Sequence, residues 1–222
     1  MFIVIEGLDG SGKSTQLQML REYLKNQNIP YEYLHFPRTD TPFFGELIAR
    51  FLRGELGSNN QVDPYLVAML YAGDRRDAAP MIRKWINDGK LVIVDRYVFS
   101  NIAYQCAKLD EPYLKNDLKN WILKLEYEYF GIPVPNLNVF LDVPMEFVEK
   151  NLNTLRAGND RNYLNGNADI HEEDINFQRK VRDIYLWLAQ TETTMRVVAC
   201  YDDSGMLPAD KVFQKLKSVV GL

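Results

Sequence analysis

The stretch that most constrains the fold of this chain runs from Gly7 to Ser14 and reads GLDGSGKS. It matches the pattern G-x-x-x-x-G-K-[ST], known as the P-loop, at every fixed position. In this pattern the glycines let backbone N–H groups surround a polyphosphate, the lysine reaches the β- and γ-phosphates, and the hydroxyl group contacts Mg²⁺. We therefore expect a nucleoside triphosphate to be bound by Gly7, Gly10, Ser11, Gly12, Lys13, Ser14 and Thr15.

The neighbours of this loop have the patterns that such a site requires. Phe2–Ile5 is a short apolar run typical of a strand covered on both faces, and leucines recur at helical spacing after Thr15. Four further strands are predicted, with helices between them, at 31–36, 91–95, 137–143 and 196–201. This alternation predicts one α/β domain over residues 1–222 with a P-loop NTPase fold, a five-stranded parallel sheet with helices on both faces, and a lid loop at about 156–174.

The composition restricts the classes of partner. The chain has 222 residues and a formal net charge of -4, and no block of Lys or Arg suggests a nucleic acid or membrane surface. No apolar run approaches the length of a membrane span and the first strand begins at Met1, so a cytoplasmic location is expected. The two cysteines and two histidines are widely spaced, which indicates neither a disulfide framework nor a Cys/His metal site.

The strand at 91–95 indicates the type of reaction. It ends in Asp95 in the manner of a Walker B strand, whose aspartate holds Mg²⁺ together with the P-loop hydroxyl, here that of Ser14. Many P-loop hydrolases place a glutamate at the next position to polarise water, whereas this chain has Arg96. A cation at that position suits an anionic acceptor. We therefore expect transfer of a phosphoryl group to a phosphate, which needs charge neutralisation and alignment but no general base.

Other charged residues fit this expectation. Neither His35 nor His171 holds a position that suggests a base. Arginines that could converge on the same crevice are Arg38, Arg75 and Arg76, and the lid could add Arg156 or Arg161. Closure of such a lid would exclude water, which otherwise hydrolyses the donor.

Several stretches of the chain resemble the thymidylate kinases, a family of nucleoside monophosphate kinases. They are FIVIEGLDGSGKSTQ at the start, FPR at 36–38, YAGDRRD at 71–77, VDRYVFSNIAYQ at 94–105, FLDVP at 140–144 and DRNYLNG at 160–166. They occur in the family's order and span most of the chain. The resemblance implies phosphorylation of dTMP to dTDP by ATP with Mg²⁺, in the service of dTTP synthesis, by a homodimer that pairs through helices such as those around Tyr65 and Tyr104.

The resemblance also implies roles for individual residues. Asp9 would hold the 3′-hydroxyl of the acceptor, and Arg38 and Arg96 would grip its phosphate. Arg75 would hydrogen-bond the thymine edge while Tyr71 stacks on the ring. The base and sugar pocket would be completed by Ser100, Asn101 and Tyr104, with Tyr163 of the lid over the sugar. Tyr104 packed against C2′ would leave no room for a further hydroxyl, which favours deoxyribose.

The lid differs from the simplest form of the family pattern. Some members carry an arginine in the P-loop where this chain has Gly10, and others supply that charge from the lid. We therefore expect Arg161, with Arg156 as the alternative, to meet the transferring phosphoryl group together with Lys13. The acidic run 169–174 beside the lid is interpreted as a solvated helix start.

Two other functions stay open at this stage. The acceptor could be a deoxynucleoside, UMP or dCMP, and a nucleoside kinase would need a carboxylate base, for which Glu6 is the obvious candidate. A P-loop switch protein would usually carry an N/T-K-x-D guanine motif, and the nearest stretch, 108–110, lacks the leading residue and the spacing. The donor base is expected near 201–204, where nothing excludes GTP.

Overall fold

The computed structural model describes residues 1–154, 164, 169–172 and 174–222. A five-stranded sheet forms its centre, with strand order β2-β3-β1-β4-β5 and every neighbouring pair parallel. The strands are β1 (Phe2–Gly7), β2 (Tyr31–His35), β3 (Leu91–Asp95), β4 (Leu137–Asp142) and β5 (Met195–Ala199). The predicted fold class is confirmed, with all five strands in place.

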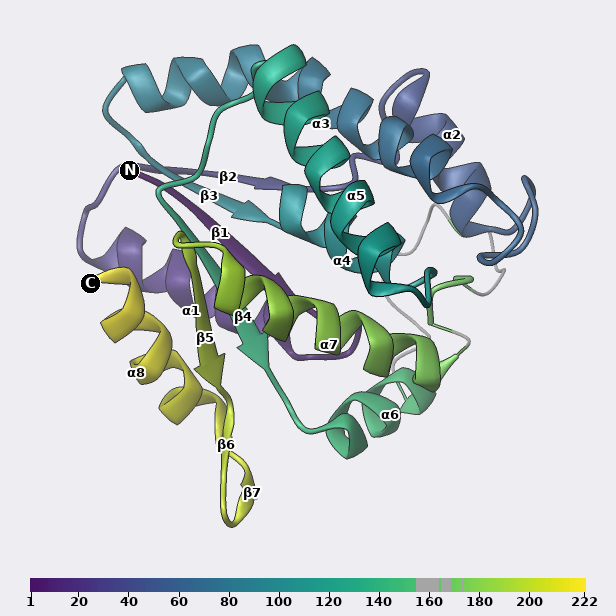
Figure 1. Ribbon diagram of the computed structural model, residues 1–222. Helices are drawn as coiled ribbons and strands as arrows, with labels where there is room; N and C mark the ends of the chain where they lie inside the picture. The colour runs from purple at the N-terminus through teal and green to yellow at the C-terminus, as the bar shows by residue number, and fades with distance from the viewer. Residues whose placement is uncertain (155–163, 165–168, 173) are drawn as a thin grey trace.

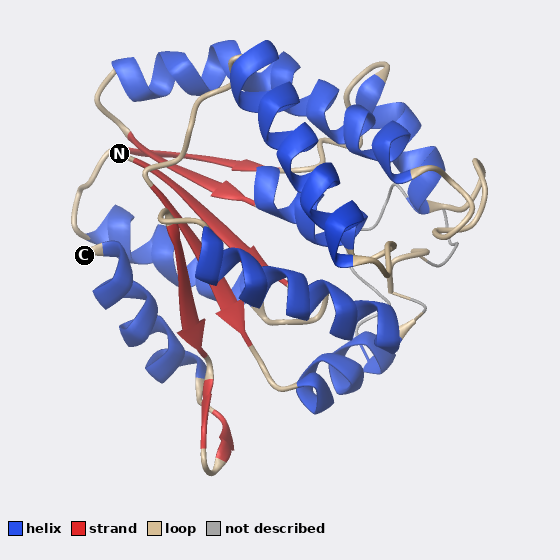
Figure 2. Ribbon diagram, in the orientation of Figure 1, coloured by secondary structure: helices blue, strands red, loops and turns tan. Residues whose placement is uncertain are grey.

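Helices cover both faces of this sheet (Figures 1 and 2). On one face lie α1 (Lys13–Asn26) and α8 (Ala209–Val220), which pack against each other, and on the opposite face lie α4 (Val98–Cys106) and α7 (Ile175–Thr191). The remaining helices are α2 (Phe44–Leu52), α3 (Pro64–Asn87), α5 (Pro112–Leu123), a π-helical turn η1 (Lys124–Tyr129) that continues α5, and α6 (Met145–Thr154).

The central strands are buried because both of their faces meet helices. Every residue of β1 and of β3 is buried, which explains why these strands consist almost wholly of apolar residues. Parallel strands bring their carboxyl ends to one edge of a sheet. The loops after β1 and β3 therefore lie side by side, and each carries charged residues, Asp9 and Lys13 in the first and Arg96 in the second.

The structure departs from the expected elements at the fifth strand. The predicted fifth strand at 196–201 ends at Ala199, and Tyr201–Asp202 instead pairs with Gly205–Met206 in a short antiparallel hairpin, β6–β7, that extends from the body. Most of the predicted lid lies outside the described residues. Among the residues described, no helix is long and apolar enough to cross a membrane.

Candidate active site

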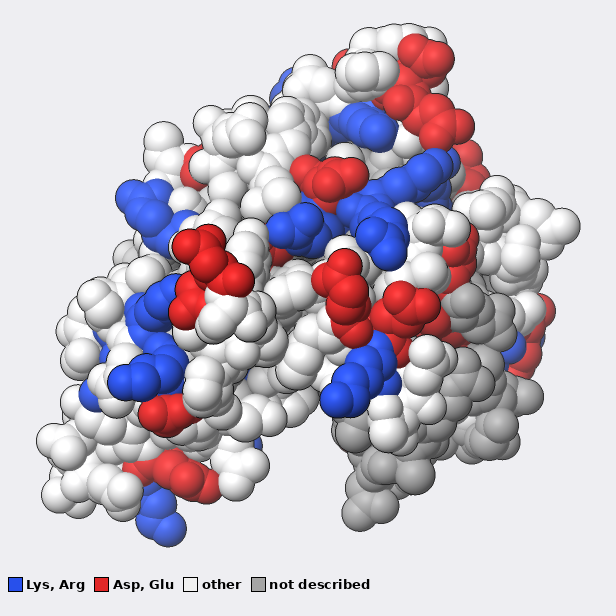
Figure 3. Space-filling view, turned by 90° about the horizontal axis from the view of Figure 1, so that it is seen from below, with Lys and Arg blue, Asp and Glu red and all other residues white. Residues whose placement is uncertain are grey.

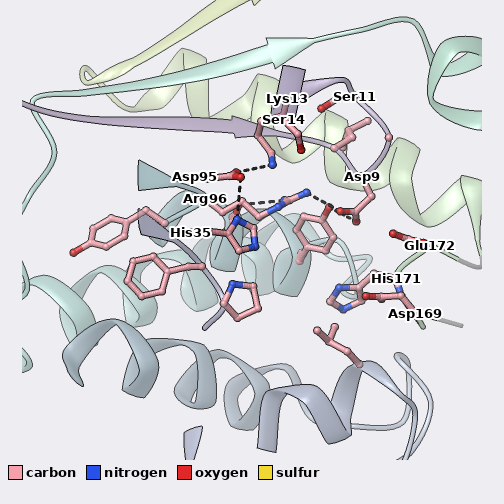
Figure 4. Close-up of a pocket in the computed structure, with 18 of the residues that line it drawn as sticks. Asp9, Ser11, Lys13, Ser14, His35, Asp95, Arg96, Asp169, His171 and Glu172 are labelled. Carbon is pink, nitrogen blue, oxygen red and sulfur yellow. Dashed lines mark hydrogen bonds and ion pairs between the residues drawn. The ribbon is translucent and has the colours of Figure 1, made fainter. Parts of the chain in front are cut away.

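A cavity of about 710 Å³ opens at the carboxyl ends of β1, β2 and β3. Its size suits a small-molecule ligand. The expected site residues that line it are Asp9, Gly10, Ser11, Gly12, Lys13, Ser14, Thr15, Tyr71, Arg75, Asp95, Arg96, Ser100, Asn101 and Tyr104. Residues as far apart in the sequence as Asp9 and Tyr104, which are 95 positions apart, thus share one cavity. Figure 4 shows the phosphate-loop side chains at one end and His171, Asp169 and Glu172 at the other.

The P-loop has the backbone geometry that its glycines permit. Gly10 and Gly12 have φ of 72° and 76°, in the left-handed region that other residues avoid. The N-terminus of α1 begins directly after Gly12, so its first N–H groups and its dipole face the loop. The Ser11 hydroxyl is buried and has no hydrogen-bond partner in the described part of the chain. These donors suit a polyphosphate, although Gly7, as the last residue of β1, is not among the lining residues.

Asp95 is the charged centre of this end of the cavity. Lys13 lies on it with Nζ 2.5 Å from Oδ1, and the Nδ1 of His35 lies 2.9 Å from Oδ2 (Figure 4). Burial acts against ionisation of Asp95, but the Lys13 charge and the His35 hydrogen bond hold the pKa of this carboxyl well below its ordinary value. The carboxylate is therefore ionised at neutral pH and available to a cation.

Arg96 stands in a backbone conformation that arginine seldom adopts, with φ of 65°. The buried carboxylate of Glu6 holds this turn in place. Its Oε1 accepts the backbone N–H groups of Tyr97 at 3.0 Å and Ser100 at 3.2 Å, at the start of α4. Its Oε2 accepts the hydroxyl groups of Ser100 and of Tyr185. Glu6 therefore fixes the turn that directs Arg96 into the cavity.

Asp9 is the partner of Arg96 across the cavity. The Nη2 of Arg96 lies 2.7 Å from Oδ1 of Asp9, while Tyr104 donates its hydroxyl to Oδ2 at 2.7 Å and Gln178 donates from Nε2 at 3.1 Å. Burial by itself would raise the pKa of Asp9, but Arg96 and Tyr104 hold it below the ordinary value. The ionised carboxylate of Asp9 is thus oriented from three elements: by Arg96 directly after β3, by Tyr104 on α4 and by Gln178 on α7.

A third ion pair, between Arg75 and Glu126, is buried in and behind the cavity wall. Arg75 on α3 donates from Nε and Nη2 to the two oxygens of Glu126, at 2.5 and 2.7 Å, and its side chain is 2% exposed. Burial would lower the pKa of Arg75, but the Glu126 charge and hydrogen bonds raise it, so the guanidinium stays charged. Asn101 lies beside them, and its Oδ1 is buried without a hydrogen-bond partner among the described residues.

Several expected site residues are not in the cavity lining. Arg38 lies beside it, held on α3 by Asp74, which accepts from its Nε at 2.8 Å and its backbone N–H at 2.9 Å. Arg161, Arg156 and Tyr163 lie outside the described residues. The interpretation of 169–174 as a solvated helix start is wrong for Asp169 and His171, which are buried in the cavity wall because α2, α4 and α7 pack around them.

Two other residues named from the sequence have defined contacts. Tyr104 is 5% exposed and directs its hydroxyl at Asp9, so its side chain belongs to the cavity, while the half-buried Tyr65 on α3 packs on Trp121 with ring centroids 5.0 Å apart; the expected homodimer stays a prediction. Glu6 is 0% exposed with both carboxylate oxygens occupied, which removes it as a catalytic base for a nucleoside acceptor.

The sequence reasoning missed the residues that support the site from other elements. They are Glu126 on η1, Gln178 on α7, and Asn151 on α6, whose Nδ2 donates to the backbone oxygen of Gly10 at 2.7 Å. His171 was passed over as well. A polar residue at an inward position of an apolar helical pattern was the available signal for Glu126 and Gln178, both of which are 0% exposed.

Figure 3 shows the molecule from below, with a hollow between two groups of side chains. Lys and Arg side chains are interspersed with Asp and Glu on this face rather than gathered into a patch of one sign. The described surface seen in this view therefore has no basic stripe of the kind that binds nucleic acid.

Comparisons with known proteins agree on one family. The model of the thymidylate kinase family matches residues 5–202. A protein of Pyrococcus horikoshii described as a probable thymidylate kinase is 31% identical over 100% of this chain and 98% of its own length. Probable thymidylate kinase 1 of Saccharolobus solfataricus is 36% identical, over 96% of each chain. The solved structure of a thymidylate kinase from Candida albicans superimposes with a TM-score of 0.70 at 27% identity, covering 99% of this chain and 90% of that one.

Proposed function

The chain belongs to the thymidylate kinase family, and from this membership and the geometry of the cavity we propose how its residues carry out the reaction. The activity of the family is the phosphorylation of dTMP to dTDP at the expense of ATP, and the chain is a phosphotransferase of this kind. Triphosphate at the P-loop and acceptor in the rest of the cavity would place the two reacting groups in one hollow, which supplies the alignment that phosphoryl transfer requires.

The single observation that carries the choice of acceptor is the pair of unfilled hydrogen-bonding positions beside Glu126. Asn101 offers a buried acceptor, Oδ1, and Arg75 offers its Nη1 group, for which no partner occurs among the described residues. Thymine presents a donor at N3 and an acceptor at O4, which complement these two groups. Tyr71 lines the same region and supplies an aromatic face for stacking.

The sugar and phosphate would lie between the base pocket and the P-loop. Asp9 accepts hydrogen bonds there and would accept one from the 3′-hydroxyl, and Arg96 opposite it would neutralise the acceptor phosphate. Tyr104, fixed by its bond to Asp9, would close the space next to C2′. Arg38 is held by Asp74 and lies outside the cavity lining, so we assign it a supporting part.

Mg²⁺ fits the residues at the other end. The hydroxyl of Ser14 and the ionised carboxylate of Asp95 are oxygen donors, which this ion prefers. When bound, the ion would neutralise charge on the β- and γ-phosphates of ATP. Lys13, within reach of the same carboxylate, would bind the phosphates directly, and Arg161 of the lid would complete the set.

An acceptor panel tests this proposal. ADP release is measured with dTMP, dUMP, UMP, dCMP and thymidine, and dTMP is expected to give the highest kcat/KM and thymidine almost none. Lys13→Ala and Arg96→Ala should each remove more than about 3 kcal/mol of transition-state stabilisation. Strong turnover of thymidine with none of dTMP, or near-normal turnover by either variant, would refute the assignment.

We further propose a homodimer with an interface on α3, the helix that carries Tyr65. Leu66 and Met69 lie one helical turn apart on α3 and are 56% and 43% exposed. Light scattering should give the mass of two chains, and Leu66→Glu should give that of one. The expected cytoplasmic location stays a prediction, which cell fractionation would test.

A further inference from the structure

Glu126 accepts hydrogen bonds from both Arg75 and Asn101, the two residues proposed to bind the base edge. One oxygen, Oε1, accepts from Nη2 of Arg75 at 2.7 Å and from Nδ2 of Asn101 at 3.0 Å, while Oε2 accepts from Nε of Arg75 at 2.5 Å. Glu126 is 0% exposed and belongs to η1, the π-helical turn that continues α5. Such turns are uncommon and occur frequently at functional sites. It is not among the residues that line the cavity, so it acts on a ligand through its two neighbours.

The amide of Asn101 has its orientation imposed by these contacts. Its Nδ2 donates to Glu126 and also to the backbone oxygen of Ala68, at 3.0 Å in each case. An amide turned by 180° would place its oxygen against two acceptors, which is repulsive. The oxygen is therefore held on the opposite side, where Oδ1 is buried and has no partner in the part of the chain that the structure describes.

This orientation distinguishes the two kinds of pyrimidine. Thymine and uracil carry N–H at position 3 and an oxygen at position 4, whereas cytosine carries an unprotonated N3 and an amino group. Oδ1 of Asn101 would accept from the N3–H of thymine or uracil, and the Arg75 guanidinium would donate to their O4. With cytosine, Oδ1 would face an unprotonated N3 and the guanidinium would face an amino group, so neither hydrogen bond could form. A buried polar group left without its partner gives strong rejection of the wrong ligand.

We propose that Glu126 is a positioning residue that sets the hydrogen-bond polarity of the base pocket, so that the site takes a pyrimidine-2,4-dione and rejects a 4-aminopyrimidine. The proposal rests on the dTMP kinase function given above and deepens it. The carboxylate has two effects: it keeps the acceptor of Asn101 turned to the base, and it directs the free edge of the Arg75 guanidinium at position 4. A residue that only filled space in the core would have neither effect.

Two substitutions of Glu126 separate the effect of its acceptor oxygens from the effect of its negative charge. Glu126→Met removes both acceptor oxygens at similar length and leaves the Asn101 amide with the backbone oxygen of Ala68 as its remaining acceptor, so its orientation is less strongly held. Glu126→Gln is the matched control for the orientation of Asn101, because its amide oxygen can occupy the place of Oε1 and go on accepting from Asn101 and from Nη2 of Arg75. Its NH2 group replaces Oε2, so the bond from Nε of Arg75 is lost. Dissociation constants for dTMP, dUMP and dCMP, measured by calorimetry without ATP, report the ratio of dCMP to dTMP affinity. The affinity for ATP and the melting temperature report folding.

Glu126→Met should reduce the preference for dTMP over dCMP at least about 10-fold, which corresponds to about one lost buried hydrogen bond. Glu126→Gln should stay within about 3-fold of the unmodified protein. The ratio of dUMP to dTMP should be the same in all three, since both bases have the same polarity. A folded Glu126→Met variant that keeps the unmodified preference would overturn the proposal. An unmodified protein with no preference for dTMP would instead refute the proposed function.

Glu126→Met leaves the buried charge of Arg75 uncompensated and could fail to fold. The double variant Arg75→Met/Glu126→Met removes the whole ion pair and is then compared with Arg75→Met alone, in which Glu126 still holds Asn101. The proposal requires the double variant to have the lower preference for dTMP over dCMP. Equal ratios in the two variants would overturn it.

Discussion

Asp9 and Arg96 form an ion pair across the mouth of the central strands, with Nη2 of the arginine 2.7 Å from Oδ1 of the aspartate. Each residue follows one of two neighbouring parallel strands, β1 and β3. The pairing therefore follows directly from the sheet register, and it brings the residue proposed for the sugar to the residue proposed for the phosphate.

Asp9→Asn is expected to weaken the acceptor site. The amide keeps an oxygen for the Tyr104 hydroxyl but no longer orients Arg96 by charge. We expect kcat/KM for dTMP to fall about 10- to 100-fold, as for the loss of a hydrogen bond between charged groups. Steady-state kinetics with varied dTMP measures this. Tyr104→Phe, which removes a neutral donor from the same carboxylate, should have the smaller effect; a larger loss in Tyr104→Phe would contradict the role given to the ion pair.

Glu6→Ala is expected to destabilise the fold by about 2–4 kcal/mol, because it leaves the N–H groups of Tyr97 and Ser100 buried without their acceptor. Urea unfolding at neutral pH measures the change in the free energy of unfolding. Tyr185→Phe is the control, since it removes one of the hydroxyl groups that donate to Glu6 and should cost only about 1 kcal/mol. Equal costs for the two variants would be inconsistent with a supporting function of Glu6 at the start of α4.

Gly10→Ala should impair both stability and nucleotide binding. A Cβ at this position would lie 3.2 Å from the backbone oxygen of Val148 and 3.3 Å from Cβ of Asn151, and φ is +72°. Gly89→Ala is a matched control, because its φ is +75° and nothing lies within 4 Å of the added atom. Both pay the left-handed strain of about 1–2 kcal/mol. Gly10→Ala should lose at least about 1 kcal/mol more through contact with α6 and should bind ATP more weakly, in calorimetric titration.

His171 should make the protein sensitive to mild acid. Burial, and after it the charge of Lys108, lower the pKa of His171 to about 3 from the ordinary 6.5. Between these two pH values the unfolded chain binds a proton at His171 that the folded protein does not bind. The contribution of the neutral His171 to the free energy of unfolding is therefore fully present above pH 6.5 and is lost as the pH falls toward 3.

His171→Phe keeps an aromatic ring against Tyr104 and Phe177 but cannot titrate. Melting temperatures from pH 7 to pH 4 should fall less steeply in this variant than in the unmodified protein. Parallel curves for the two proteins would show that another group is responsible.

The parts of the fold that local patterns determine could be predicted from the sequence. The apolar runs at Phe2–Ile5 and Leu91–Val94 read correctly as central strands because burial on both faces excludes polar residues there. The hairpin after Cys200 could not be predicted in the same way. Its two strands have two residues each, which is too few for an alternating pattern to develop, and the predicted strand at 196–201 ran into the first of them.

The site residues also differ in whether local patterns could predict them. Those in the P-loop and the Asp95–Arg96 pair could be predicted because each group belongs to a motif of neighbouring residues. Glu126, Gln178 and His171 come from η1, from α7 and from the segment before α7, and only the packing of those elements brings them to the cavity. The acidic run at 169–174 was misread for this reason, since the sequence alone does not determine which face of a segment is covered by another element.

The position of β1 between β3 and β4 has a consequence for synthesis of the chain. Strand β1 pairs with residues 92–95 on one side and 137–141 on the other, and both partners are made after it. Until those residues have been made, FIVIEG has two unpaired edges, and α1, which follows it in the chain and packs on it, can cover only one of its faces. An apolar strand with unpaired edges is the kind of segment that associates with other chains. The strand that supports the phosphate loop is thus made well before the strands that protect its edges.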